Sequence, residues 1–142
     1  MDGTGATAVL GHWSLLLAVM ANLVGNAIVH APAASRVMVK VQARRGRCTV
    51  TVEDEGTGLP PDVLALIDKG DWRALMSARP GSGFGLATVA SVVAAHGGSL
   101  SAWNLPTHLP PRDRGTFRGA CVQVALPAVP ASTSNIIRFP GA

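Results

Sequence analysis

The sequence predicts an α+β domain, a two-layer α/β sandwich with three helices on one face of a mixed, mostly antiparallel sheet of about five strands. Two long apolar segments, 14–30 and 86–96, have the length and composition of packed helices. Between them, residues 37–53 carry valines at alternating positions, as in paired strands. With 142 residues, 48% of them hydrophobic, the chain is long enough for one domain with a core of normal size.

The first helix is expected to begin with Ser14 as its N-cap and to run to about His30. No Asp, Glu, Lys or Arg occurs from 3 to 35, so a transmembrane helix is the competing interpretation. Asn22, Asn26 and His30 recur every four residues and therefore share one face of the helix. Each would be costly in lipid, and we favour an amphipathic helix whose polar face lines a site.

A β-hairpin should follow the first helix. Residues 37–45 and 48–53 alternate as two strands, and Arg45-Gly46 between them is expected to form the turn. Cys48 in the second strand has no metal-ligand spacing to the only other cysteine, Cys121, so we expect two buried free thiols in a reducing compartment.

The remaining elements are predicted from prolines and glycines that begin or end helices, and from short apolar runs. Pro60-Pro61-Asp62 should open a short helix over about 63–67. The further expected elements are a loop at 69–80, a helix at 86–96 closed by Gly97-Gly98, strands at 99–103 and 121–126, and a flexible tail at 128–142 after a domain spanning 1–127.

The net charge of +4 would suit an anionic partner. However, no basic stripe interleaved with aromatic residues is present, and aromatic residues make up only 4% of the chain. We therefore expect no nucleic-acid partner.

Two motifs indicate nucleotide chemistry. Asn22 and Asn26 lie one helical turn apart, and an amide oxygen is a hard, neutral ligand suited to Mg²⁺. Asp54 follows a strand and precedes Gly56 and Gly58, where a carboxylate can accept a hydrogen bond from the amine of adenine. The glycines would let the backbone approach a flat ring closely.

A third motif is the glycine series Gly81, Gly83 and Gly85 ahead of a helix, where backbone amides attract phosphate. It comes too late in the chain for a dinucleotide-binding fold, and the lysine pattern of a P-loop is absent.

Together, Asn22 to Ala27, Asp54 to Gly58 and Gly81 to Leu86 resemble the N, G1 and G2 boxes of the GHKL ATPase superfamily, which has the Bergerat fold. The match is closest to the catalytic ATP-binding domain of bacterial sensor histidine kinases and covers roughly 14–127. His96-Gly97-Gly98 and the final Leu126-Pro127 also resemble that family.

The resemblance implies ATP and Mg²⁺ as ligands. It implies that Asn26 binds the metal, that Asn22 lies beside the phosphates and that Asp54 takes the adenine amine. Gly56 and Gly58 would shape the base pocket. Gly83 and Gly85 would wrap the phosphates as part of a mobile lid, and Gly81, Phe84 and Leu86 are further expected nucleotide-binding residues.

The sequence departs from the family pattern in ways that bear on the phosphates. Val29 and His30 stand where the family often has Lys followed by an aromatic residue or His, so His30 joins the expected site without that lysine. Arg73 or Arg79 could supply the missing charge. The phenylalanine-rich F box is not visible, although Trp72 could fill its place.

The resemblance implies a histidine protein kinase that donates the γ-phosphate of ATP to a histidine on a separate dimerisation domain, and through it serves a response regulator. No histidine here lies in a segment resembling that acceptor hairpin, so we expect the acceptor outside this chain. We also expect the isolated domain to be monomeric, and cytoplasmic or the cytoplasmic portion of a membrane-bound sensor. Two alternatives remain open. One is an anti-sigma-factor serine kinase, which usually has Glu at the position of Asn22. The other is a non-catalytic nucleotide-sensing module.

Overall fold

The computed structural model of the chain describes residues 7–71, 73–75, 85–105 and 119–130. Its helices and strands are, in chain order, β1 (Thr7–Ala8), α1 (Trp13–His30), β2 (Val37–Arg44), β3 (Arg47–Asp54), α2 (Pro61–Lys69), α4 (Leu86–Ala95), β4 (Ser99–Asn104), β5 (Ala120–Pro127) and β6 (Val129–Pro130).

The main sheet has four strands in the order β2-β3-β5-β4, and each neighbouring pair is antiparallel. The α+β class is confirmed, but the expectation of about five strands in a mixed sheet is wrong for the described residues. β5 lies between β3 and β4, an order that the sequence did not predict. Alternating hydrophobic residues indicate which face of a strand is buried but not which strands are its neighbours. β1 and β6, which the sequence did not predict, form a separate antiparallel pair.

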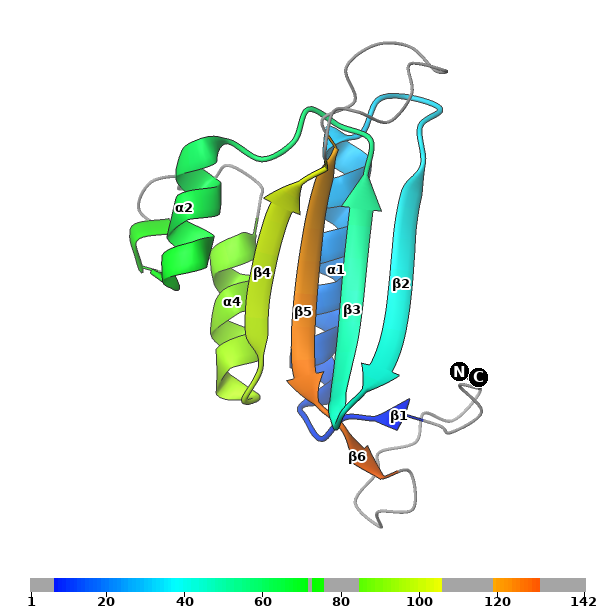
Figure 1. The fold of residues 1–142 in the computed structure, drawn as a ribbon, viewed down its shortest axis with the longest axis vertical. Coiled ribbons are helices and arrows are strands. Elements are labelled where there is room, and N and C mark those ends of the chain that lie inside the picture. Colours follow the sequence, from blue (N-terminus) through cyan, green and yellow to red (C-terminus); the bar gives the residue numbers. More distant parts are fainter. Residues whose placement is uncertain (1–6, 72, 76–84, 106–118, 131–142) are drawn as a thin grey trace.

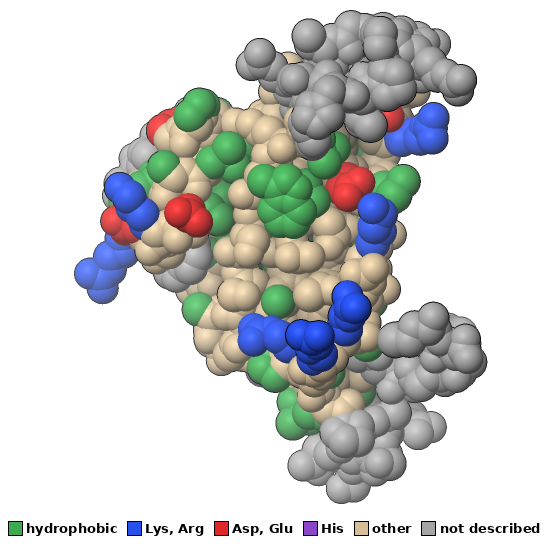
Figure 2. All heavy atoms as spheres, viewed as in Figure 1, with side chains coloured by type: hydrophobic (Ala, Val, Ile, Leu, Met, Phe, Trp, Pro, Cys, Tyr) green, Lys and Arg blue, Asp and Glu red, His purple; other side chains and the backbone are tan. Residues whose placement is uncertain are grey.

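The helices leave one face of the sheet open. α1 and α4 lie behind the sheet in Figure 1, and α2 lies beside β4. Figure 2 views the open face, where Lys and Arg side chains gather at the end that carries the β2–β3 turn. Exposed Arg44, Arg45 and Arg47 belong to that turn and its flanking strand ends. The result is a two-layer domain with its core on the helical side only.

The β2–β3 hairpin is confirmed. Val39 pairs with Val52, so the valines of both strands share the side that faces the helices. Arg45 and Gly46 both have positive φ, 51° and 75°, as a two-residue hairpin turn that follows the twist of the strands requires.

α1 begins two residues earlier than expected. His12, not Ser14, occupies the N-cap position, and no side chain caps the helix there. The His12 N–H instead donates to Nε2 of His96 at 3.0 Å, which joins the start of α1 to the end of α4. A contact between residues so far apart in the chain takes the place of a local capping signal.

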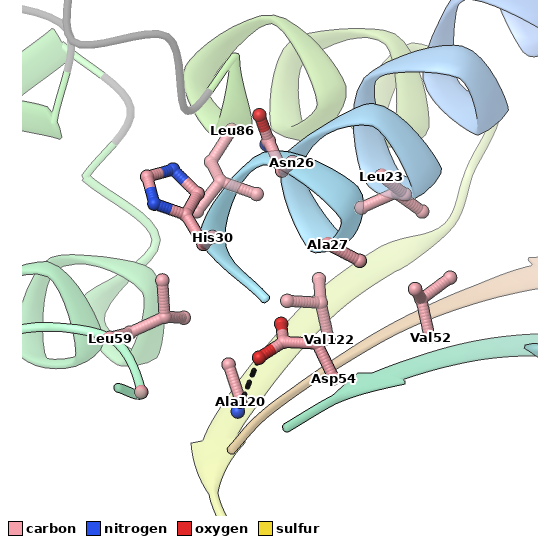
Figure 3. Close-up of a pocket in the computed structure, with 11 residues that line it drawn as sticks. Leu23, Asn26, Ala27, His30, Val52, Asp54, Leu59, Leu86, Ala120 and Val122 are labelled. Atoms are coloured by element: carbon pink, nitrogen blue, oxygen red, sulfur yellow. Dashed lines mark hydrogen bonds between the residues drawn. The ribbon is translucent and has the colours of Figure 1, made fainter. Parts of the chain in front are cut away.

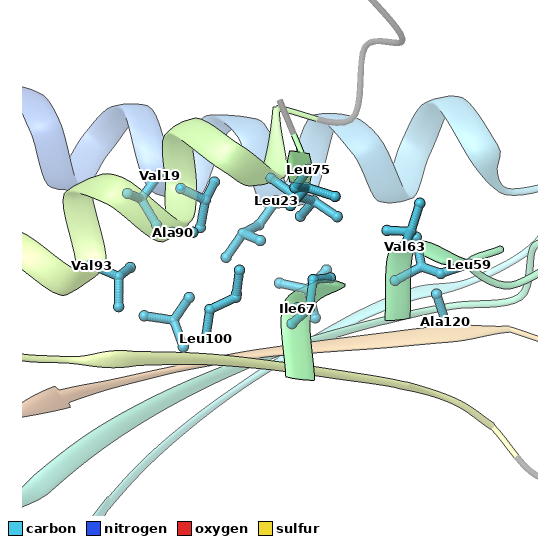
Figure 4. Close-up of a cluster of buried hydrophobic side chains, with 14 of the residues drawn as sticks. Val19, Leu23, Leu59, Val63, Ile67, Leu75, Ala90, Val93, Leu100 and Ala120 are labelled. Atoms are coloured by element: carbon cyan, nitrogen blue, oxygen red, sulfur yellow. The ribbon is translucent and has the colours of Figure 1, made fainter. Parts of the chain in front are cut away.

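α1 is the one helix of the described residues that is long and apolar enough to span a membrane. It packs on the sheet, however, with Val19, Leu23 and Ala27 buried in the core. Figure 4 shows side chains of α1 meeting those of α4, α2 and β4 between the helical layer and the sheet. The position of α1 agrees with the amphipathic interpretation of its sequence.

α4 begins at Leu86 as expected, whereas α2 is two residues longer at each end than the expected 63–67. α2 has Pro61 in its first turn and ends at Gly70, whose φ is 69°. Residues 73–75, expected as loop, are helical, because Oδ1 of Asp71 accepts the N–H of Ala74 at 3.0 Å and Leu75 is buried in the core. The sequence shows no clear apolar period in this segment.

Candidate functional site

Asp54 lies at the carboxyl end of β3 and is 8% exposed. Its Oδ1 accepts two backbone hydrogen bonds, from Gly56 at 2.8 Å and from Ala120 at 3.3 Å. The first closes the turn after β3, and the second joins β3 to the start of β5. The carboxylate is therefore held in one orientation, and its second oxygen points toward the pocket (Figure 3).

The polar face of α1 reaches the same place. Asn26 and His30 line the pocket with Asp54, as the four-residue spacing predicted. Asn22 lies one turn earlier, where its Nδ2 donates to the carbonyl of Ala18 at 2.8 Å. That bond orients the Asn22 amide, and its Oδ1 faces the start of α4.

Two glycines are required by contacts with α1. A Cβ on Gly85 would lie 2.2 Å from Oδ1 of Asn22, and the φ of Gly85 is +58°. A Cβ on Gly56 would lie 2.4 Å from the carbonyl oxygen of His30. The G1 and G2 segments thus touch the N-box helix so closely that no side chain fits between them. Gly58, with φ +84°, lines the pocket directly.

The pocket has a mostly apolar wall and is open to solvent; the empty space in it and at its mouth is about 430 Å³. It is lined by Leu23, Asn26, Ala27, His30, Val52, Asp54, Gly58, Leu59, Leu86, Ala120 and Val122. Figure 3 shows these side chains converging from α1, the sheet and the start of α4.

Most residues of the apolar wall were not predicted as site residues; Leu86 was. Part of it could have been found from periodicity, because Val52 lies two positions before Asp54 on the same strand face and Leu23 one turn before Asn26 on α1. Ala120 and Val122 enter only through the pairing of β5 with β3.

Several expected site residues lie outside the described part of the chain: Trp72, Arg79, Gly81, Gly83 and Phe84. Among the described residues, no group of three His, Cys, Asp or Glu could hold a metal ion. A divalent cation here would need the neutral oxygen of an asparagine together with oxygens of a bound ligand. Asn26 has the right chemistry for that, because Mg²⁺ accepts few protein ligands and keeps bound phosphates and water.

The two cysteines contribute no reactive group. Both are free and buried, as expected. Burial raises the pKa of both thiols, and for Cys121 burial together with the nearby negative charges of Glu53 and Asp54 raises the pKa to about 11. Since the thiolate is the nucleophilic form, both side chains are structural.

The geometry suits a planar heterocycle that bears an exocyclic amine. The apolar wall would cover the faces of such a ring, and the free oxygen of Asp54 would accept from the amine. Asn22 and Asn26 lie farther along α1, toward the start of α4, where a polar substituent of the ring would extend.

Comparison with known proteins agrees with this geometry. Residues 11–130 match the family described as histidine kinase-, DNA gyrase B-, and HSP90-like ATPases. The sensor-like histidine kinase SenX3 of Mycobacterium tuberculosis H37Rv is 36% identical over 132 residues, which are 90% of this chain and 30% of SenX3. The sensor protein KdpD of Escherichia coli K12 is 34% identical over 77% of this chain and 11% of KdpD. The chain thus spans less than a third of these relatives.

Solved structures of sensor histidine kinases are also similar to this chain. The mycobacterial sensor histidine kinase MprB superposes with a TM-score of 0.66 at 31% identity, over 89% of this chain and 78% of that one. Full-length ShkA in complex with AMPPNP superposes with a TM-score of 0.64 at 25% identity, over 91% of this chain and 25% of ShkA.

Proposed function

This chain belongs to the histidine kinase-, DNA gyrase B-, and HSP90-like ATPase family and resembles the ATP-binding catalytic domains of sensor histidine kinases. From that premise we propose that it binds Mg-ATP and donates the γ-phosphate to a histidine on a separate dimerisation domain.

One observation carries the proposal. Asp54, Asn26 and His30 come from β3 and α1, yet all three line one pocket with apolar walls. Two backbone N–H groups hold one oxygen of the Asp54 carboxylate, which leaves the other for the amine of adenine. Guanine would present a carbonyl oxygen to that carboxylate and would be rejected. The base pocket therefore selects adenine.

The part of the site proposed to bind the phosphates is formed by α1 and the start of α4. We propose that Asn26 supplies one oxygen to Mg²⁺ and that Asn22 contacts the phosphates, with His30 beside them. The metal, when bound, would neutralise phosphate charge, and Asn26 would be the residue that holds it. Gly85 packs against Asn22, so the amides at the start of α4 lie near the same end of the pocket. Gly81, Gly83, Phe84 and Arg79 complete the proposed lid.

The partners follow from the reaction class. The acceptor histidine would lie on a helical dimerisation domain, which passes the phosphoryl group on to a response regulator. We further propose that the isolated domain is monomeric. The expected domain end at 127 is too early, because Val129–Pro130 (β6) pairs with β1; the rest of the expected tail, 131–142, lies outside the described residues. In the cell it would lie in the cytoplasm as a part of a membrane-bound sensor.

Phosphotransfer in trans tests the proposal. The chain is incubated with Mg-[γ-³²P]ATP and a separately produced helical dimerisation domain of a sensor histidine kinase, which carries the acceptor histidine. Acid-labile, base-stable label on the acceptor histidine is expected, and none when the acceptor His is changed to Gln.

Two other outcomes would contradict histidine kinase activity. Acid-stable label on serine in a partner would indicate the serine kinase alternative. Tight Mg-ATP binding with no transfer to any histidine acceptor tried would indicate a nucleotide-sensing module. Val29 stands in α1 where the family often has a lysine, so one contact to the phosphates would be missing. For that reason the second outcome should be measured.

A further inference from the structure

Asn104, the last residue of β4, makes a paired contact with the loop between β3 and α2. Its Oδ1 accepts the N–H of Leu59 at 2.8 Å, and its Nδ2 donates to the carbonyl of Leu59 at 3.0 Å. One amide side chain thus satisfies both backbone groups of one residue, as a neighbouring strand would.

The loop that Asn104 holds forms part of the base pocket. Leu59 is 8% exposed and lines the pocket opposite α1. Residues 55–60 contain no helix or strand, and Gly56 and Gly58 leave this segment few local restraints. Hydrogen bonds hold this segment at Asp54, Glu55 and Leu59, and of these only the bonds to Leu59 hold a residue of the apolar pocket wall.

Asp54 and Leu59 are both held by the place where the end of β4 lies beside the start of β5. Asn104 pairs in register with Ala120, and Ala120 donates to Oδ1 of Asp54. Leu105, next to Asn104, donates to the carbonyl of Gly119 at 2.8 Å. The adjoining ends of β4 and β5 thus hold the carboxylate on one side and the Leu59 wall on the other.

We infer that Asn104 is a positioning residue that sets the spacing between Leu59 and Asp54, and with it the width of the adenine slot. The inference rests on the proposed function. It assigns to Asn104 a share of base affinity, although the side chain does not line the pocket. Loss of the amide would release the Leu59 wall and leave the phosphate side unchanged.

The test compares three variants at 25 °C by calorimetry. Asn104→Ala removes both hydrogen bonds. Asn104→Asp keeps the acceptor for the Leu59 N–H but turns a carboxylate oxygen toward the Leu59 carbonyl. Gln123→Ala is the matched control, because it removes an amide that donates to Thr51 at 3.2 Å on the open face of the sheet.

Asn104→Ala and Asn104→Asp should each weaken ADP and adenosine binding about tenfold, the effect of one or two lost neutral hydrogen bonds. Affinity for inorganic triphosphate should not change. Gln123→Ala should lower only the melting temperature.

Unchanged ADP affinity in a folded Asn104 variant would overturn the inference. Equal losses for adenosine and triphosphate would do the same, since they would indicate a general structural role. If Asn104→Ala does not fold, Asn104→Asp decides. Failure of the unmodified chain to bind any adenine nucleotide would instead overturn the proposed function itself.

Discussion

Replacement of Asp54 by Asn should weaken adenine nucleotide binding and reduce its selectivity. The amide retains an oxygen to accept from Gly56 and Ala120, so the two backbone bonds at 2.8 and 3.3 Å can persist. The atom that points into the pocket becomes an N–H donor facing the donor amine of adenine. The hydrogen bond lost is charge-assisted and contributes about 1.5–3 kcal/mol. Since about 1.4 kcal/mol is a tenfold change, the Kd for ADP should rise roughly 10- to 150-fold.

The same change should improve guanine binding, because the new N–H can donate to the guanine carbonyl. Isothermal titration calorimetry with ADP and GDP gives both affinities, and their ratio should fall sharply in the variant. Asp54→Ala is less informative, because it also leaves two backbone N–H groups without an acceptor in a buried site.

Glu55→Gln provides the matched control. Glu55 is the adjacent carboxylate, but its Oε2 accepts the N–H of Arg36 at 3.0 Å and the residue is not among those lining the pocket. Its variant should bind ADP normally. Equal ATP and GTP affinity in the unmodified chain, or unchanged ADP affinity in Asp54→Asn, would refute the assignment of Asp54 to the base.

Three further predictions concern the metal, the glycine contact and the buried thiol. Asn26→Ala should reduce ATP affinity in Mg²⁺ more than ADP affinity in EDTA, because the lost oxygen acts through the ion; equal losses in the two titrations would contradict a metal-ligand role. Gly85→Ala should weaken ATP binding and lower the melting temperature, because its Cβ would lie 2.2 Å from Oδ1 of Asn22. Gly46→Ala is its control, since φ there is also positive, +75°, with nothing within 4 Å; both variants carry a backbone strain of about 1–2 kcal/mol, and only Gly85→Ala should affect ATP. The raised pKa of Cys121, about 11, means that the folded thiol stays protonated while the unfolded thiol ionises near pH 8.5. Its contribution to stability is therefore complete below about pH 8.5 and is lost as the pH rises toward 11. Urea unfolding at several pH values should show this decline, and a Cys121→Ala variant with the same slope would contradict it.

The sequence alone determined the elements whose signals are local. The alternation over 37–53 and the turn at Arg45-Gly46 predicted a hairpin that the structure contains. The four-residue spacing on α1 correctly placed Asn26 and His30 on a shared face that lines the pocket. Each of these follows from geometry within one helix or one strand pair, where side-chain direction is set by the period of the backbone.

Only the tertiary structure decided which of these elements meet. The order β2-β3-β5-β4 puts Ala120 beside Asp54, although 66 residues separate them in the chain. Likewise, the hydrogen bonds between Asn104 and Leu59 and the close approach of Gly85 to Asn22 join segments whose sequences do not predict that they meet. Hydrophobic periodicity selects the buried face of a strand but not its neighbour, so the pairing is fixed by packing of the whole core. The apolar wall of the pocket depends on that packing, because β5 and α1 each supply two of its residues, Ala120 and Val122 from β5 and Leu23 and Ala27 from α1.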